Sequence, residues 1–399
     1  MKNAILYFII SPFLGFIQAL RNYRQSWAKP TLIAFIAFFG FTMVKNDTVD
    51  SSRYIHKLEE MYASNKNFDD IKASLYSDEG GGQTDVYVTI VTYFVSWFTN
   101  SGNFLFLIYA LIFGYFYVNN AWMVLDQSKG KLRWEQILLL ISFSSIVAFW
   151  DVNAVRMWTA AQVFFYGGFL YLYQEKKKGL IIATSSLLIH FSFILPVALL
   201  LAYSLVRLNF RFLYFFYIAS FFIAELNIGF IHSALEANMP GFLQPKIKTY
   251  FNDEYLEGYE EVVATVNWYV LYYKKLITYF NVVFISILFF KADLSKPARR
   301  LLGFSLLFLG VANIISLLPS GGRFLNVAFL FSLAFSFIVV SNNKVSIIAK
   351  SVKWLSPILI LFIVISIRMS FDYISIITLT NPIVALFTDI NTSLIELIK

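Results

Sequence analysis

The chain alternates between apolar runs and short polar connections, and this pattern predicts the fold. Runs of about 20 apolar residues are typical of helices that cross a bilayer. We therefore expect an all-α polytopic membrane protein with about 10–12 transmembrane helices, forming a single integral membrane domain over residues 1–399. The apolar runs are 4–20, 31–44, 86–98, 104–125, 136–150, 155–173, 180–206, 212–234, 269–290, 301–318, 324–340 and 354–370.

The charge of the connections predicts which side of the membrane each one faces. Basic residues dominate six of them, whereas the segments 46–85 and 235–268 are acidic. Because basic loops are retained in the cytoplasm, we expect these six inside and the two acidic segments outside. The basic loops hold Arg21, Arg24 and Lys29; Lys129, Lys131 and Arg133; Lys176, Lys177 and Lys178; Arg207 and Arg211; Lys291, Lys296, Arg299 and Arg300; and Lys344, Lys350 and Lys353.

All six basic loops can lie on the same side of the membrane only if two of the apolar runs do not form single membrane crossings. Run 86–98 is shorter than the ~17–25 residues that a spanning helix needs. Run 180–206 is polar near its middle, at His190 and Ser192, so we expect a broken pair of helices lining a polar cavity. This gives ten crossings, two re-entrant elements and an outside N-terminus. The alternative is twelve simple spans with one basic loop that breaks the rule.

The first run, 4–20, lacks a small-residue cleavage site before Arg21, so we expect a retained span rather than a signal peptide.

Composition agrees with a membrane protein. Hydrophobic residues make up 58% and charged residues 14% of the chain, against roughly a quarter charged in soluble domains. The net charge of +8 would suggest a nucleic-acid partner in a soluble protein, but basic cytoplasmic loops explain it here, so no nucleic acid is expected. The absence of cysteine excludes disulfides and cysteine catalysis. His56, His190 and His232 lack metal-ligand spacing, so we expect no metal.

Polar residues that are energetically costly in contact with lipid lie at the predicted outer ends of the spans. Ionisable residues at membrane depth are functional candidates because they are costly and usually face a cavity. Arginines there suit a phosphate group that they can grip with two hydrogen bonds. Together they favour a polyprenyl-diphosphate lipid as ligand, with outer tyrosines stacking on its sugars. The candidates are Asp50, Arg53, Tyr54, Asp151, Asn153, Arg156, His190, Ser192, Glu225, Lys274, Lys275, Gly322, Arg323 and Arg368.

Each candidate also has a purely structural explanation. The two arginines, Arg156 and Arg323, could extend to outer headgroups, and the lysine pair Lys274 and Lys275 could anchor a helix end. The remaining candidates could form ordinary hydrogen bonds or ion pairs. They are His190 as a hydrogen-bonded core residue, Asp50 with Arg53, and Glu225 with a neighbouring arginine.

The order and spacing of these residues resemble the EpsG/Wzy-like family of bacterial polysaccharide polymerases. That family has an acidic-then-tyrosine motif after the second span, matched by Asp47-Thr-Val-Asp-Ser-Ser-Arg-Tyr54. It also has an outer arginine, a lysine cluster and an Ile-His-x-Ser motif, matched by Arg156, Lys176–Lys178 and Ile189-His-Phe-Ser192. Gly322-Arg323 matches its late outer Gly-Arg. Where family members often have an arginine before the acidic motif, this chain has Lys45-Asn46.

The resemblance implies a metal-independent membrane glycosyltransferase without a cofactor. It would join oligosaccharide units carried on undecaprenyl diphosphate at the outer leaflet of the bacterial inner membrane, producing O-antigen, capsule or exopolysaccharide. A flippase and a chain-length regulator are the protein partners that such a role implies. His190, Arg156, Arg323 and Asp50 would be catalytic, and Arg53, Tyr54, Ser192, Gly322, Lys274 and Lys275 would bind substrate. The base for the acceptor hydroxyl stays open between His190, Asp50 and Glu225.

Three other functions compete with polymerisation. A glycan ligase is usually centred on a larger outer domain than the two acidic segments here. An acyltransferase needs a histidine facing a cytoplasmic donor, whereas His190 is predicted on the outer side. A lipid-linked oligosaccharide flippase predicts regular spans with internal symmetry, and the sequence has no visible repeat.

Overall fold

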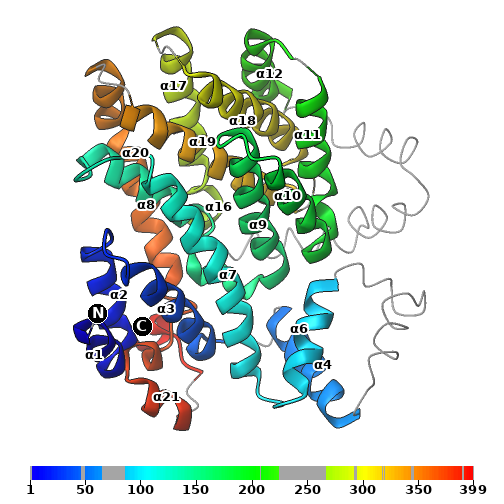
Figure 1. The fold of residues 1–399 in the computed structure, drawn as a ribbon, viewed down its shortest axis with the longest axis vertical. Helices are drawn as coiled ribbons and strands as arrows, with labels where there is room; N and C mark the ends of the chain where they lie inside the picture. The colour runs from blue at the N-terminus through cyan, green and yellow to red at the C-terminus, as the bar shows by residue number, and fades with distance from the viewer. Residues whose placement is uncertain are drawn as a thin grey trace. The chain divides into compact units, whose positions relative to one another are not determined.

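The protein is built from α-helices in a computed structural model (Figure 1). The structure describes residues 2–45, 50–64, 86–206, 208–223, 267–291, 294–316, 318, 320–342, 346–388 and 391–398. No strand occurs among them, and Ser375 and Ser393 form an isolated bridge. The predicted all-α class is confirmed.

Helices account for nearly every predicted apolar run, and their bounds follow in chain order. They are α1 (Lys2–Ile10), α2 (Pro12–Arg21), α3 (Ala28–Thr42), α4 (Asp50–Ser64), α6 (Val86–Ser96), α7 (Gly102–Leu125), α8 (Trp134–Ile146), η2 (Phe149–Asn153), α9 (Val155–Leu172), α10 (Lys178–Ile189), η3 (Phe191–Phe193), α11 (Ile194–Leu205), α12 (Phe210–Ile223), α16 (Trp268–Tyr272), α17 (Lys275–Lys291), α18 (Lys296–Ile315), α19 (Gly322–Asn342), α20 (Ser346–Ser370), η5 (Ile376–Leu379), α21 (Pro382–Phe387) and α22 (Leu394–Ile398).

Within the described ranges, six helical segments are long and apolar enough to cross a membrane. They are Gly102–Leu125, Trp134–Asn153, Trp268–Phe290, Lys296–Ile315, Gly322–Asn342 and Ile347–Ser370. Shorter apolar helices accompany them, at Ala28–Thr42, Val86–Ser96, Lys178–Ile189, Phe191–Leu205 and Phe210–Phe222. The chain is therefore a multi-pass membrane protein.

Two of the predicted irregular runs have the expected form. The run at 86–98 is the short helix α6, of 11 residues. The run at 180–206 is divided into α10 and α11, each of 12 residues, by His190 in extended conformation and the 3-10 turn η3. A helix of 12 residues is ~18 Å long, short of the ~30 Å hydrocarbon core.

The prediction that run 4–20 forms one span is wrong. The run is divided into α1, of 9 residues, and α2, of 10 residues, by extended backbone at Ser11. Pro12 at the start of α2 has no N–H to continue the helical hydrogen bonds of α1. Neither half is long enough to cross.

The described chain separates into two compact units. The first holds Met1–Asp126, Val147–Val197 and Ser366–Lys399, and the second holds Gln127–Ile146 and Ala198–Ile365. Of the candidate residues, those between positions 50 and 192 belong to the first unit, as does Arg368. Lys274, Lys275, Gly322 and Arg323 belong to the second.

Close backbone contacts set the helix directions in the first unit. Gly167 of α9 lies against the backbone of Ala183 and Gly179 of α10, so these helices form a tight antiparallel hairpin (Figure 1). Gly40 of α3 lies against Phe106 of α7, which makes that pair antiparallel as well. A buried amide pair ties α7 to α9, with Asn120 Nδ2 donating to Gln162 Oε1 at 2.7 Å.

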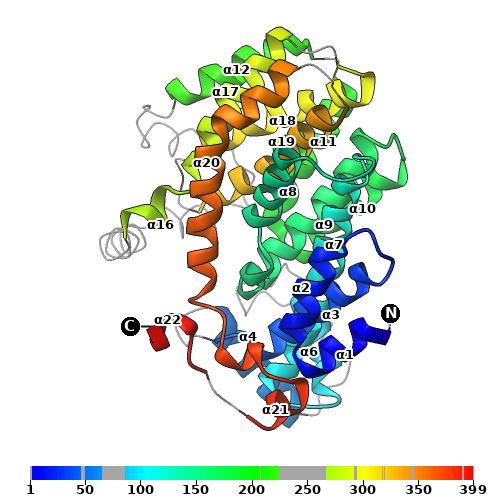
Figure 2. The ribbon, with the colours of Figure 1, turned by 90° about the vertical axis from the view of Figure 1, so that its left-hand side faces the viewer.

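The C-terminal tail packs on the helices at the start of the chain, as Figures 1 and 2 both show for α21. The hydroxyls of Thr42 and Thr378 are 2.9 Å apart, and Ile377 and Ala385 pack on Phe38 and Phe41. Beyond them, Asn391 exchanges two hydrogen bonds of 2.8 Å with the backbone of Lys45. The tail therefore fixes the end of α3, next to the start of α4.

The second unit is built on the hairpin of α18 and α19, against which α12 and α8 pack. Asn313 Nδ2 of α18 donates to Ser220 Oγ of α12 at 2.8 Å. At the start of α8, Gln136 Nε2 donates to Ser341 Oγ at the end of α19, at 2.9 Å. These buried polar links fix the helix order where lipid offers no hydrogen-bond partner.

We expect substitution of Gly167 by alanine to destabilise the protein. A Cβ at Gly167 would overlap the backbone nitrogen of Ala183, and overpacking of this kind costs about 1–3 kcal/mol. The measurement is thermal unfolding of the purified protein in detergent. Gly322→Ala is the matched control because a Cβ there meets nothing within 4 Å. Equal melting temperatures for the two variants would contradict the backbone contact.

Candidate functional site

Both units gather their basic loops at one end of the helices. In the first unit, the start of α3, the end of α7 and the turn between α9 and α10 all line one cavity. In the second unit, the guanidinium carbon of Arg299 at the start of α18 lies 6.0 Å from the ring centre of Phe210 at the start of α12, so the two basic loops before these helices lie together. At the start of α8, Glu135 Oε1 is 3.4 Å from Lys353 Nζ of α20. Within each unit taken by itself, this grouping agrees with the prediction that its basic loops share one side.

The candidate residues of the first unit lie at the opposite end of its helices. Arg156 is in the first turn of α9, and His190 directly follows α10. Because α9 and α10 are antiparallel neighbours, both residues lie at the end of the hairpin remote from Lys176–Lys178. The structure thus places Arg156 and His190 at one end of this hairpin, and the side of the membrane that this end faces stays a prediction.

Two arginines and a tyrosine form the centre of this end. Tyr54 of α4 is 4% exposed. The guanidinium carbons of Arg53 and Arg156 each lie 6.0 Å from the centre of its ring. Cation–π contacts of this kind contribute about 0.5–2 kcal/mol, with the larger values in desolvated sites. Tyr54 therefore holds two cations from different helices close together.

Two further tyrosines, which the sequence analysis did not identify, extend the cluster. Tyr109 of α7 lies 6.1 Å from Tyr54 and 5.7 Å from Tyr87 of α6, measured between ring centres. The Tyr109 hydroxyl is 2.8 Å from the hydroxyl of Thr92, which is fully buried. The threonines of run 86–98 were a visible polar signal, but Tyr109 lies inside an unbroken apolar run and gave none.

Several buried polar atoms around this cluster lack hydrogen-bond partners within the described part of the chain. They belong to Tyr87, Asn153, Thr159 and Ser192. The hydroxyls of Tyr87 and Thr159 lie near each other, in a geometry that falls short of a hydrogen bond. Buried polar groups in native proteins are nearly always satisfied, by water or ligand where not by protein. This end of the first unit can therefore accept a polar ligand.

His190 sits at the break in the helix. Its backbone N–H donates to Ser186 O at 3.0 Å, and its carbonyl accepts from Phe193 N at 3.0 Å. The rings of Phe193 and Phe164 of α9 are 5.9 Å apart, which attaches the break to α9. Its imidazole Nδ1 is buried. The structure thus makes His190 the corner of the broken helix, at the same end as Arg156.

Lys45, which stands near the acidic motif, is held by several acceptors. Its ammonium group donates to the side-chain oxygen of Asn103, and to the carbonyls of Phe41 and Met43 at 3.4 Å each. It also lies 5.8 Å from the ring centre of Phe106. These contacts give Lys45 a structural role at the end of α3.

Two of the candidates have structural roles. Asp151 Oδ2 accepts from the backbone N–H of Ala148 at 2.8 Å and so stabilises the 3-10 turn before α9. Arg368 pairs with Asp372 at 3.0 Å.

Others lie outside the described residues. Asp50 begins α4, but its side chain is not described. Glu225 and most of the acidic segments 46–85 and 235–268 are not described either.

The candidates of the second unit lie at helix starts. Arg323 is exposed in the first turn of α19, which begins at Gly322. The preceding turn is tight: Ser320 has a φ of 61°, and a Cβ at Gly321 would overlap the carbonyl of Ile315. The lysine pair is at the start of α17, where Lys274 and Lys275 lie 5.6 and 4.5 Å from the ring centres of Tyr273 and Tyr272.

The cysteine-free chain allows a direct test of sidedness. We expect Lys177→Cys to react with a membrane-impermeant maleimide only after the cells are permeabilised, because Lys177 lies in a basic loop. His56→Cys, in the exposed part of α4, should react in intact cells. The opposite labelling pattern would contradict the topology on which the site rests.

Comparison of the chain with protein-family models, curated proteins and solved structures finds no match.

Proposed function

We propose that the protein polymerises oligosaccharide repeat units carried on undecaprenyl diphosphate, at the outer face of the bacterial cytoplasmic membrane. The observation that carries this proposal is the placement of Arg53 and Arg156, from two different helices, next to the ring of Tyr54. Four helices, α4, α6, α7 and α9, supply that cluster and its neighbours. It lies at the end of the first unit opposite the basic loops.

The charges of the cluster suit a diphosphate. Arginine remains protonated and binds phosphate oxygens with paired hydrogen bonds. An anionic ligand would be attracted to both guanidinium groups, because they lie close together beside Tyr54. Tyr54 lies between these arginines and the rings of Tyr87 and Tyr109, which support it from behind.

The reaction requires little from the protein beyond charge and position. The acceptor hydroxyl oxygen attacks the anomeric carbon of the donor chain, and the bond from that carbon to the diphosphate oxygen breaks. Undecaprenyl diphosphate leaves with the bond electrons, and the acceptor proton passes to a base. Arginines that bind the developing negative charge lower the barrier. His190, at the same end as Arg156, is our first choice for the base, with Asp50 as the alternative.

Within the second unit, Arg323 and the lysine pair are the residues that suit phosphate. Arg323 is exposed in the first turn of a helix, where backbone N–H groups and the helix dipole favour phosphate. Gly322 leaves space there, since a Cβ would meet nothing within 4 Å. Lys274 and Lys275 add positive charge at the start of α17.

We expect Arg156→Ala and Arg323→Ala to abolish long glycan chains while the protein stays in the membrane. Loss of one group that stabilises developing charge reduces turnover by roughly 10²-fold or more. The measurement is a gel of surface glycan beside an immunoblot of the membrane fraction. Arg24→Ala is the control, because Arg24 pairs with exposed Asp126 at the other end of the first unit. Normal chain lengths in both variants would contradict the proposal.

Deletion of the whole protein separates polymerisation from the competing functions. A collapse of surface glycan to single repeat units indicates a polymerase. Loss of every surface unit indicates a flippase or a ligase instead.

We expect His190→Gln to reduce polymerisation more than it reduces the amount of protein in the membrane. Glutamine can hydrogen-bond but cannot accept a proton at neutral pH, so a base would be lost while the corner of the helix is kept. The test is polymer yield divided by membrane abundance. If this ratio is unchanged from wild type, His190 has a structural role only.

A further inference from the structure

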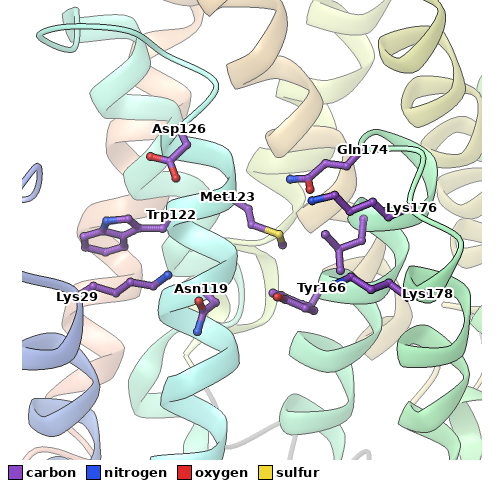
Figure 3. A pocket seen from close by; sticks show the side chains of 10 residues that line it. Lys29, Asn119, Trp122, Met123, Asp126, Tyr166, Gln174, Lys176 and Lys178 are labelled. Atoms are coloured by element: carbon purple, nitrogen blue, oxygen red, sulfur yellow. The ribbon is translucent and has the colours of Figure 1, made fainter. Parts of the chain in front are cut away.

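A cavity lies at the basic end of the first unit, remote from the arginine–tyrosine cluster. It has a volume of about 230 Å³ and opens between α7, α9 and the turn into α10 (Figure 3). Its lining combines basic, amide, aromatic and apolar side chains. These are Lys29, Asn119, Trp122, Met123, Asp126, Tyr166, Leu170, Gln174, Lys176 and Lys178.

The rim of the cavity is cationic. Figure 3 shows Lys29 on one side and Lys176 on the other, with both side chains directed toward the space between them. Lys178 adds a third ammonium group at the first residue of α10, where the helix dipole also favours an anion. The one acidic lining residue, Asp126, is 3.7 Å from Arg24, which offsets its charge.

Aromatic and apolar side chains also line the cavity. Trp122 and Tyr166 line it together with Leu170, which is 4% exposed. Tryptophan and tyrosine are enriched at the depth of lipid headgroups because one part of each ring system is apolar and another forms hydrogen bonds. A ligand that fits has an anionic head for the lysines and a less polar part that reaches toward the hydrocarbon.

We propose that this cavity binds the phosphate ester of an anionic glycerophospholipid headgroup in the cytoplasmic leaflet. The phosphate would lie between Lys29, Lys176 and Lys178, and the glycerol would lie against Trp122 and Tyr166. Basic pockets between helices on the cytoplasmic side suit anionic headgroups. A soluble phosphate ester has the same head chemistry, but it would leave Trp122 and Tyr166 without a partner.

The test is native mass spectrometry of the full chain in detergent, with phosphatidylglycerol, phosphatidylcholine of the same acyl chains, and glycerol 3-phosphate as probes. The variant K29Q/K176Q/K178Q removes the three ammonium groups of the cavity. The control K129Q/K131Q/K177Q removes the same charge from exposed lysines that do not line the cavity. A third variant, K29R/K176R/K178R, retains the charge and so separates loss of charge from loss of fold.

Wild type should bind phosphatidylglycerol more tightly than phosphatidylcholine. The glutamine variant of the cavity should bind phosphatidylglycerol about ten-fold more weakly or worse, whereas the control and the arginine variant should stay within about two-fold of wild type. Equal binding by the cavity variant and its control would overturn the proposal. Binding of glycerol 3-phosphate as tight as that of phosphatidylglycerol would assign the cavity to a soluble ester and overturn the lipid assignment.

Discussion

The backbone contact between α9 and α10 determines where the chemistry of the first unit can lie. Gly167 and Gly179 bring these helices together without side chains between them, and such close approach is what small residues provide in membrane helix packing. With the hairpin fixed, Lys176–Lys178 occupy one end, and Arg156 and His190 occupy the other. The separation of positive loops from candidate residues therefore follows from a contact close to the turn that joins α9 to α10.

Charge in a membrane protein is costly, and the two ends of the first unit use it differently. At the basic end, lysines and two aromatic side chains line an open cavity. At the other end, Arg53 and Arg156 lie against buried Tyr54, and several nearby polar atoms lack partners in the described part of the chain. The first arrangement suits a headgroup at the bilayer surface. The second suits a lipid-linked diphosphate drawn into a partly dry site.

Much of this arrangement could be predicted from the sequence, because loop charge and apolar length act locally. The charge rule placed Arg156 and His190 together, and the polar centre of run 180–206 predicted the break at His190. Tertiary packing set the rest. The role of Tyr109 depends on its contact with Thr92, Tyr54 and Tyr87, which its apolar neighbours in the sequence do not reveal. The division of run 4–20 depends on the backbone at Ser11–Pro12, which hydropathy alone overlooked.

The most direct test of the account is the affinity of the purified protein for undecaprenyl diphosphate and for undecaprenyl monophosphate. The account predicts that wild type prefers the diphosphate, because two arginines meet the additional phosphate charge. The variant R53A/R156A should bind undecaprenyl diphosphate at least about ten-fold more weakly than wild type and should no longer prefer it to the monophosphate. The control variant R24A should keep the preference for the diphosphate. Equal affinity of wild type and R53A/R156A for the diphosphate would contradict the account.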